Sequence, residues 1–243
     1  MAAAVASAVS GSGPRPSRLT LPTGREVVLG WCEVGREDAA SLWPAEREAL
    51  ARCRLDKRRH ELIAGRVAAH RALALLAPGA HAEVLARPGG QDEGRPFFPS
   101  APDVALSISH SEGLAVAAVA RGGALGVDLE QRVEAGGAFL EEAFAPGEHE
   151  GYAAPCAGRV EPVTAAWAMK EAVLKVWGVG LRAPLQRVAV RPVLLSASGE
   201  ALSLRLTLEA EGLPPELGVP PAVLTGLLLA GEHGRVLALA APA

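Results

Sequence analysis

Two groups of elements, each a long helical run followed by shorter strand-like runs, constrain the fold of this chain most. In the first group, residues 44–77 are rich in helix formers, and the run ends at Pro78-Gly79. In the second group, Val163–Trp177 has the composition and spacing of a helix that Gly178 ends. Helices followed by runs of strands predict an α+β fold. The repetition is compatible with two similar halves, although no sequence repeat supports a duplication.

The strand-like runs are short and bounded by turn residues. Val104–Ser109 alternates between large apolar and small or polar residues, the pattern of a strand with one buried face. Leu114–Ala120 and Ala124–Glu130 follow as further strands, and residues 187–241 hold at least four more strand-like runs. Residues 138–152 are predicted to form one or two short helices, broken at Pro146-Gly147.

Composition and periodicity divide the chain into three parts. Residues 1–19 are small, rich in Gly, Pro and Ser, and aperiodic, so we expect a disordered N-terminal tail. The apolar start of this tail lacks the basic region of a signal peptide. We expect residues 20–122 to form an N-terminal half and residues 123–243 to form a C-terminal half.

Composition also excludes several classes of protein. Apolar residues make up 49% of the 243 residues and the mean hydropathy is +0.21, which excludes a disordered chain. The apolar runs are too short for a membrane span, and the net charge of −3 argues against a nucleic-acid-binding protein. The three cysteines are scattered, which favours neither disulfides nor a zinc site. We therefore expect a cytoplasmic protein without nucleic-acid or membrane partners.

Charge is polarised along the chain. Residues 52–71 carry seven basic residues against two acids, and residues 128–150 carry seven acids against one Arg. A basic segment beside an acidic one suits an anionic ligand with a divalent cation, although such runs are more commonly solvated helix faces. Of the 24 basic residues only Lys57, Lys170 and Lys175 are lysines, and two of them lie in the second helix. Lysine in so arginine-rich a chain slightly favours a role for a compact ammonium.

Five residues could build one polar site. Asp128 and Glu130 are two apart in a strand, so they project side by side, where paired carboxylates favour a cation such as Mg²⁺. Trp167, Glu171 and Lys175 are spaced by four and share one helix face. Glu171 could complete the metal site, and Lys175 could neutralise a phosphate or protonate a leaving group. A solvated strand end and a surface ion pair are the alternatives for these two patterns.

Two further residues that could contact an anion lie between the two helices in the sequence. His110 ends a strand in the run Leu106–Ser111, where it is either a structural histidine or a phosphate contact. Arg95 lies in the loop Gly94–Phe97, where it is either an ordinary loop residue or a ligand clamp. The chain has no G-x-S-x-G elbow, which argues against a Ser–His nucleophile, and it has no phosphate-binding P-loop, G-x-G-x-x-G or H-E-x-x-H motif.

Taken in order, these segments resemble the 4′-phosphopantetheinyl transferases, specifically the Sfp-type branch that serves polyketide and non-ribosomal peptide synthases. The family pattern is a basic helical segment, G-[KR]-P, a [NS]-I-S-H-S strand end, G-[IV]-D-[ILV]-E and W-x-x-K-E-[AS]-x-x-K. The matching segments here are Arg58–Arg66, Gly94–Pro96, Ser107–Ser111, Gly126–Glu130 and Trp167–Lys175. The resemblance covers residues 52–184 and depends on five motifs in order rather than on any single one.

The resemblance implies a pseudo-dimeric α+β fold with the active site between two similar halves. It implies transfer of the 4′-phosphopantetheine group of coenzyme A to a serine of a carrier protein, with adenosine 3′,5′-bisphosphate as the second product. Asp128, Glu130 and Glu171 would hold Mg²⁺ or Mn²⁺, and Glu171 and Lys175 would be catalytic. His110 would contact the coenzyme A 3′-phosphate, with Arg95 near the adenine–ribose end. The full set of implied coenzyme A contacts is Arg58, Arg59, Arg95, Ser109, His110 and Lys175.

The chain departs from the family pattern in the basic helix, where Glu61 and Leu62 stand at positions that related sequences can fill with basic or hydroxyl residues. Glu148 resembles a further acid of the family. Two alternatives stay open: a protein that binds coenzyme A or the carrier without transfer, and a Mg²⁺-dependent phosphohydrolase of coenzyme A or nucleotides. The expected partners are acyl or peptidyl carrier proteins of polyketide, non-ribosomal peptide or fatty acid synthases. We expect a monomer, because a duplicated fold supplies its own interface.

Overall fold

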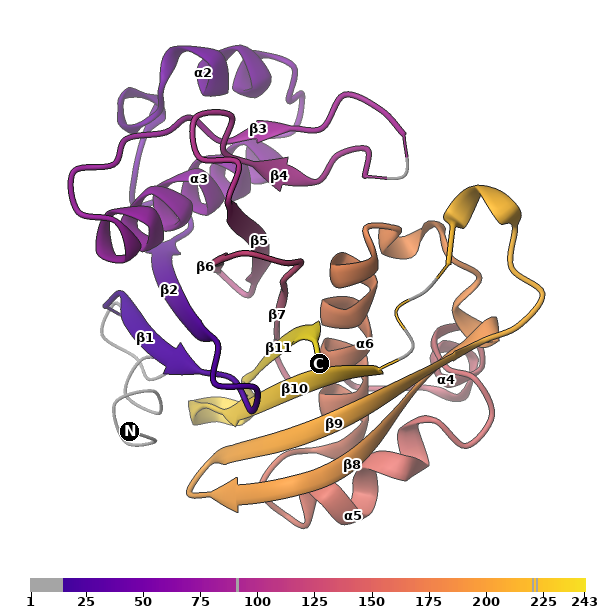
Figure 1. The fold of residues 1–243 in the computed structure, drawn as a ribbon. Helices are drawn as coiled ribbons and strands as arrows, with labels where there is room; N and C mark the ends of the chain where they lie inside the picture. Colours follow the sequence, from indigo (N-terminus) through magenta and orange to yellow (C-terminus); the bar gives the residue numbers. More distant parts are fainter. Residues whose placement is uncertain (1–14, 91, 220, 222) are drawn as a thin grey trace.

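Two antiparallel sheets form the centre of the molecule. The computed structural model describes residues 15–90, 92–219, 221 and 223–243. The first sheet has the strand order β1-β2-β6-β5 and the second the order β7-β11-β10-β9-β8, while β3 pairs with β4 apart from both (Figure 1). The chain crosses from the first sheet to the second between β6 and β7, so each half of the chain supplies one sheet.

Each half also supplies one long helix. The N-terminal half contains β1 (Ser17–Thr20), β2 (Glu26–Glu33), a 3₁₀ turn (Ala39–Ser41), α2 (Pro44–Ala51), α3 (Asp56–Leu76), β3 (Leu85–Ala86), β4 (Pro96–Phe97), β5 (Val104–Ser111) and β6 (Leu114–Arg121). The C-terminal half contains β7 (Gly126–Glu130), α4 (Gly137–Ala143), α5 (Ala153–Cys156), α6 (Pro162–Trp177), β8 (Val188–Ser198), β9 (Ala201–Ala210), β10 (Val223–Ala230) and β11 (Val236–Pro242). Its 3₁₀ turns are His149–Tyr152, Gly180–Arg182, Leu185–Arg187, Pro215–Leu217 and Glu232–Gly234.

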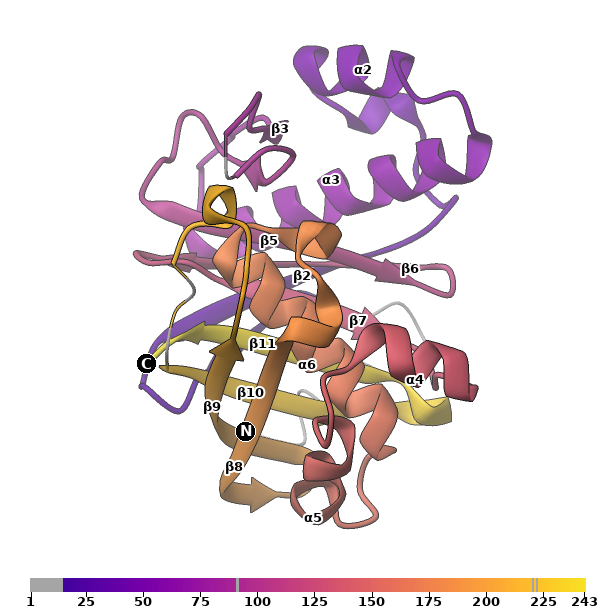
Figure 2. The same cartoon turned by 90° about the vertical axis from the view of Figure 1, so that its right-hand side faces the viewer.

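The apolar side chains form three adjoining clusters because strand residues alternate between faces. The cluster between the sheets takes alternate residues from β2, β6, β7 and β11, including Trp31, Val127 and Leu239. A second cluster lies between α3 and the first sheet, and a third between α6 and the second sheet. Figure 2 shows α3 on one side of the molecule and α6 against the strands of the second sheet.

Both long helices cross their sheets at a glycine. A Cβ added to Gly30 on β2 would lie 2.0 Å from the Ala68 carbonyl oxygen of α3. A Cβ added to Gly126 on β7 would lie 1.9 Å from the Ala172 carbonyl oxygen of α6. Only glycine permits so close an approach of helix to strand. The predicted α+β fold of two similar halves is confirmed.

The elements expected from the sequence are present, with one correction. The helix predicted over Val163–Trp177 is α6, and the four runs predicted in residues 187–241 are β8 to β11. The disordered tail predicted over residues 1–19 is wrong for Ser17 to Leu19, because these residues pair with β2 as strand β1. Arg15 and Pro16 are exposed and have no regular secondary structure, and residues 1–14 of that prediction lie outside the described residues. Among the described residues, no helix has the length and apolar content to cross a membrane.

Candidate active site

The site lies where the edge strands of the two sheets meet. β5 and β7 run in the same direction and are joined through serine side chains of β5. The Ser107 hydroxyl accepts the backbone N–H of Val127 at 3.0 Å, and the Ser109 hydroxyl donates to Asp128 Oδ1 at 2.7 Å. Ser109, expected to contact coenzyme A, therefore holds a carboxylate in place. The alternation of strand faces leaves Asp128 on the side of β7 that faces α6.

Helix α6 places three predicted residues opposite β7. The helix begins where the Glu161 carboxylate accepts the backbone N–H groups of its first turn, and it ends at Gly178, whose φ of +87° is left-handed. Trp167, Glu171 and Lys175 lie one turn apart between these caps. Their predicted common face is confirmed, since Trp167 and Lys175 both bond to β7 carboxylates.

Glu130 is held from both halves of the molecule. Ser111 Oγ donates to Glu130 Oε2 at 3.5 Å, and Trp167 Nε1 donates to Oε1 at 3.1 Å. Burial raises the pKa of Glu130 to about 7, and repulsion from Asp128 and then Glu171 adds to this effect. A carboxylate with this pKa gains or loses a proton near neutrality, and a bound cation would favour its ionised form.

Lys175 lies between carboxylates. Its Nζ is 2.6 Å from Asp128 Oδ1, 3.0 Å from the Val127 carbonyl oxygen and 3.9 Å from Glu171 Oε2. Burial and, to a smaller extent, the Asp128 charge raise the pKa of Glu171 to about 7, while the Lys175 charge acts in the opposite direction. One ammonium therefore faces three neighbouring carboxylates, and negative charge remains in excess when all are ionised.

The carboxylates fit a divalent cation by their chemistry. Asp128 is 2% exposed, and its Oδ2 is buried without a hydrogen-bond partner in the part of the chain that the structure describes. Carboxylate oxygens are the ligands that Mg²⁺ prefers. The side chains do not converge on a point, however, since no group of three or more His, Cys, Asp or Glu residues among those described is arranged to hold a metal. The Lys175 ammonium lies where it neutralises part of the same charge.

The residues predicted to contact coenzyme A on α3 and β5, Arg58 and His110, contact one another and an acid. Arg58 Nη1 donates to His110 Nε2 at 2.9 Å and lies 3.4 Å from Glu61 Oε2. Glu61 is also 3.6 Å from His110 Nε2. Burial lowers the pKa of His110, Glu61 opposes this, and the charges of Arg58 and Lys175 lower it further. Ser111, the next residue of β5, bonds to Glu130, so this group lies near the carboxylate site.

Arg95 lines a cavity of about 430 Å³ between the halves. The cavity is lined by the Gly94–Pro96 loop, by β5, by Lys175 and by the segment after α6. Arg95 forms an ion pair with Asp92 at 3.0 Å, and this pair packs on Gly178, where an added Cβ would lie 2.3 Å from Asp92 Oδ1. The Arg95 and Lys175 cations thus share one cavity, large enough for part of a nucleotide.

Two residues singled out from the sequence have structural contacts instead. Arg59 donates to the carbonyl oxygens of Leu50 and Cys53, so it joins α3 to the end of α2 and is not brought to the site. Glu148 is fully buried, 2.7 Å from Lys170 Nζ, and also accepts backbone N–H groups of the chain around it. Glu148 therefore fixes α6 against its neighbours from behind the site.

The sequence analysis missed two residues that shape the site. Ser107 and Ser111 were named only as part of a motif, yet both bond to β7. Their spacing of two from Ser109 was a usable signal, because it places all three hydroxyls on one strand face. That the facing strand would be β7 could not be inferred, since it depends on how the sheets pack.

Family models match both halves of the chain. The 4′-phosphopantetheinyl transferase N-terminal domain matches residues 37–120, and the 4′-phosphopantetheinyl transferase superfamily matches residues 124–210. The chain belongs to the 4′-phosphopantetheinyl transferase superfamily. Within that superfamily it is of the Sfp type, with an N-terminal and a C-terminal domain in one chain.

Curated relatives agree with this assignment. A 4′-phosphopantetheinyl transferase of Bacillus subtilis is 32% identical over 42% of this chain and 46% of its own. The L-aminoadipate-semialdehyde dehydrogenase-phosphopantetheinyl transferase of Eremothecium gossypii is 32% identical over 49% of this chain and 46% of its own. A holo-[acyl-carrier-protein] synthase of Roseiflexus sp. is 45% identical over 20% of this chain and 33% of its own. The chain thus spans half or less of the length of these relatives.

Proposed function

We propose that this protein transfers the 4′-phosphopantetheine group of coenzyme A to a serine of an acyl or peptidyl carrier protein, in a Mg²⁺-dependent reaction. The second product would be adenosine 3′,5′-bisphosphate. The observation that carries the proposal is the group Asp128, Glu130, Glu171 and Lys175 at the junction of the halves, beside a cavity that Lys175 and Arg95 line. Relatives named for this activity support it.

The three carboxylates would hold Mg²⁺, or Mn²⁺, through oxygens that include the unpartnered Asp128 Oδ2. The bound ion would neutralise the diphosphate of coenzyme A and the charge that develops in phosphoryl transfer. Lys175 would contribute a further positive charge at the leaving group, where a compact ammonium is suited to the task. No protein nucleophile is needed, because the carrier serine attacks.

Glu171 would act as the base for the carrier serine, directly or through water. Its pKa of about 7 is near the pH at which a general base is both ionised in part and basic enough to accept a proton. Arg58, Arg95 and His110 would lie along the adenosine end of coenzyme A. The N-terminal half, residues 20–122, would then supply mainly coenzyme A contacts, and residues 123–243 the metal site.

The partners would be carrier proteins of polyketide, non-ribosomal peptide or fatty acid synthases. We also propose a monomer in the cytoplasm. The packing of the two sheets on each other within one chain supports a monomer. A cytoplasmic location is supported by the three cysteines, all of which are free thiols: Cys32, Cys53 and Cys156.

Intact-mass spectrometry of an apo carrier protein tests the proposal. The carrier would be incubated with the protein, coenzyme A and Mg²⁺, with EDTA as the control. We expect a metal-dependent gain of one phosphopantetheine on the carrier. No gain on acyl and peptidyl carriers alike would overturn transfer, and bisphosphate release without a carrier would indicate a phosphohydrolase.

A further inference from the structure

The link between α2 and α3 presents an exposed leucine among cations. Leu55 is 72% exposed, more than any other large apolar side chain that the structure describes in the N-terminal half. Arg52 and Arg54 are exposed, and their guanidinium groups form no hydrogen bond or ion pair with any described residue. Lys57, in the first turn of α3, is 89% exposed and lies 3.9 Å from Glu61 Oε1. These residues form the α2–α3 corner: Arg52, Arg54, Leu55 and Lys57. An apolar centre with a polar rim is the arrangement of a protein interface.

The backbone of the α2–α3 corner is held in place from within the protein. Arg59 Nη1 donates to the carbonyl oxygen of Leu50 at 3.1 Å and to that of Cys53 at 3.4 Å. The backbone N–H of Arg59 also donates to the Leu55 carbonyl oxygen at 3.0 Å. These contacts fix the corner before any partner binds. A preformed surface loses less conformational entropy on binding than a mobile one, which favours association.

One cavity separates the α2–α3 corner from the carboxylate site. This cavity of about 480 Å³ is lined by Val34, Lys57, Glu61 and residues 110–113. Ser111, on the wall opposite α3, donates through Oγ to Glu130 Oε2 at 3.5 Å. Figure 2 shows the link from α2 to α3, the turn between β5 and β6, and α4 on one side of the molecule. Each partner of a protein complex commonly covers about 800 Å², so a protein docked at the carboxylates can also cover the corner.

Charge is polarised across this side of the molecule. Asp56 is the one acid among residues 52–58, whereas α4 carries the exposed Glu141 and Glu142. A partner with an acidic face is attracted to the α2–α3 corner and repelled by α4, so the charges favour one orientation of the partner. Arg58 is not part of this surface, because it donates to His110 within the cavity. The corner therefore fits a negatively charged protein face that has an apolar groove for Leu55.

We infer that the α2–α3 corner is a docking surface for the carrier protein and selects carriers with such an acidic face. The inference rests on the proposed transfer to a carrier. Leu55 would be buried in the contact, and Arg52, Arg54 and Lys57 would pair with carboxylates around it. The corner would bind and orient the carrier without taking part in the chemical step. Changes at the corner should therefore act on the KM for the carrier rather than on kcat or the KM for coenzyme A.

Transfer kinetics with the carrier as the varied substrate test the inference. Leu55→Asp and Arg54→Glu should each raise the KM for an acidic carrier at least about tenfold, with less than about twofold change in kcat and in the KM for coenzyme A. Val193→Asp and Arg205→Glu are the matched controls, because these paired residues are exposed on β8 and β9, at the edge of the second sheet away from β7. The controls should leave the KM for the carrier unchanged.

A charge exchange sharpens this test. In a carrier variant, lysines replace the acidic residues nearest to the serine. This variant should have a raised KM with the native protein, and Arg54→Glu should lower that KM again. A merely structural effect of Arg54→Glu would not restore the altered carrier, so the exchange separates docking from loss of folding.

A KM for the carrier that is unchanged in both corner variants would overturn the inference. If no carrier is modified, the proposed function fails instead, and docking is decided by biolayer interferometry with an apo carrier that has alanine in place of its serine. Binding to the native protein that weakens about tenfold or more in Leu55→Asp supports docking, and equal binding or none contradicts it. Binding to phosphatidylglycerol vesicles that is lost in Leu55→Asp, with carrier binding unchanged, would assign the corner to a membrane surface and overturn the inference.

Discussion

The two halves of this chain pack a long helix on a sheet in the same way, but they differ in the polar side chains at matched positions. In each half a strand crosses a long helix at a glycine, Gly30 on β2 and Gly126 on β7. One residue beyond each glycine, the carbonyl oxygen accepts from a cation on the helix. Arg71 donates to the Trp31 carbonyl at 2.8 Å, and Lys175 donates to the Val127 carbonyl at 3.0 Å. Matched positions can therefore be compared directly.

Each half also has a buried glutamate that precedes its long helix in the sequence. Glu46 accepts the backbone N–H of Val84 and lies 2.8 Å from His70 on α3. Glu148 accepts the backbone N–H of Val190 and lies 2.7 Å from Lys170 on α6. Each glutamate also accepts the N–H of the residue three positions before it. The repeated parts are thus the ones that fix each helix on its sheet.

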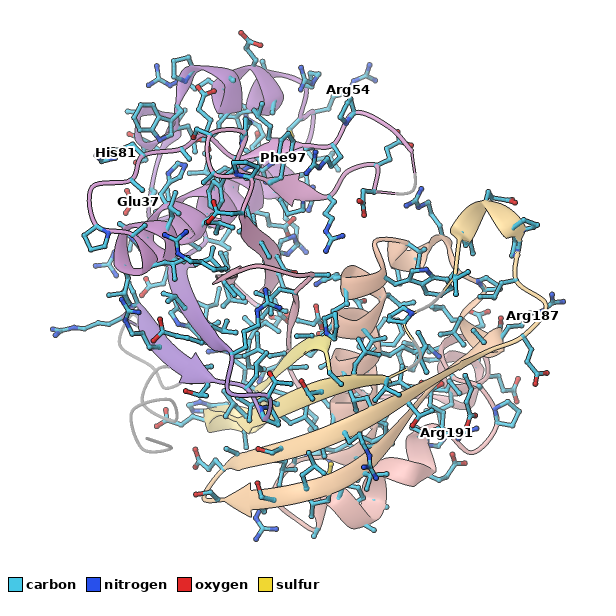
Figure 3. All side chains as sticks on the ribbon, viewed as in Figure 1. Glu37, Arg54, His81, Phe97, Arg187 and Arg191 are labelled. Atoms are coloured by element: carbon cyan, nitrogen blue, oxygen red, sulfur yellow. The ribbon has the colours of Figure 1, made fainter. Side chains whose placement is uncertain are left out.

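The positions that match the three carboxylates of the site hold no carboxylate in the first half. Counting from the glycine and the facing helix alanine, Asp128, Glu130 and Glu171 correspond to Cys32, Val34 and Val67. Arg71, which corresponds to Lys175, forms an ion pair with Glu37 at 2.6 Å instead; Figure 3 labels Glu37 within the N-terminal half. The shared packing of helix on sheet is therefore not sufficient to form a site. The second half has three carboxylates at positions where the first half has none.

The largest expected effect comes from removing one of these carboxylates. Asp128→Asn should lower kcat/KM for transfer by about 10³-fold or more, because metal affinity and the charge pairing with Lys175 are both lost. Cys32→Ala, the substitution at the matched position of the first half, should change kcat/KM less than threefold. Steady-state transfer assays measure both. Equal losses of kcat/KM in the two variants would contradict the assignment of the site to the second half.

The repeated glutamate contacts should matter for stability. Lys170→Met leaves Glu148 buried without its cation, and breaking such a pair costs about 3–5 kcal/mol of unfolding free energy. His70→Gln, in the first half, keeps a hydrogen-bond donor near Glu46 and should cost about 1 kcal/mol. Urea unfolding followed by circular dichroism compares them. If Lys170→Met were as stable as the native protein, the pair would not hold α6 in place.

Substitutions of the matched cations Lys175 and Arg71 should affect different properties, turnover in the first case and stability in the second. Lys175→Ala should lower kcat by about 10²-fold and change the KM for coenzyme A by less, because the ammonium acts on charge that develops in the reaction. Arg71→Ala should leave kcat unchanged and lower stability. Saturation kinetics and urea unfolding distinguish these outcomes. A rise in KM alone for Lys175→Ala would make it a binding residue only.

Metal affinity should depend on pH. The pKa values of Glu130 and Glu171 are about 7, so both are largely protonated at pH 6 and largely ionised at pH 8. A cation competes with these protons, so affinity for Mn²⁺ should rise about tenfold from pH 6 to pH 8 for each carboxylate that must ionise. Calorimetric titration at the two pH values measures this. An affinity independent of pH would exclude both as ligands.

Much of the site could be predicted because its residues lie in short motifs. Asp128 and Glu130 share a strand face, and Glu171 and Lys175 a helix face, whatever the tertiary structure. The contacts of Arg59 and Glu148 could not be predicted, because they depend on how α2 and β8 pack against the long helices. The start of β1 was missed for the same reason, since its pairing with β2 overrides a composition typical of loops.

The central claim is that one chain of two like halves builds one metal site, in the second half. Mn²⁺ titration in the presence of coenzyme A, followed by electron paramagnetic resonance, tests it most directly. The account predicts one bound Mn²⁺ per chain, lost in Asp128→Asn and kept in Cys32→Ala. No bound Mn²⁺, or one that survives Asp128→Asn, would contradict it.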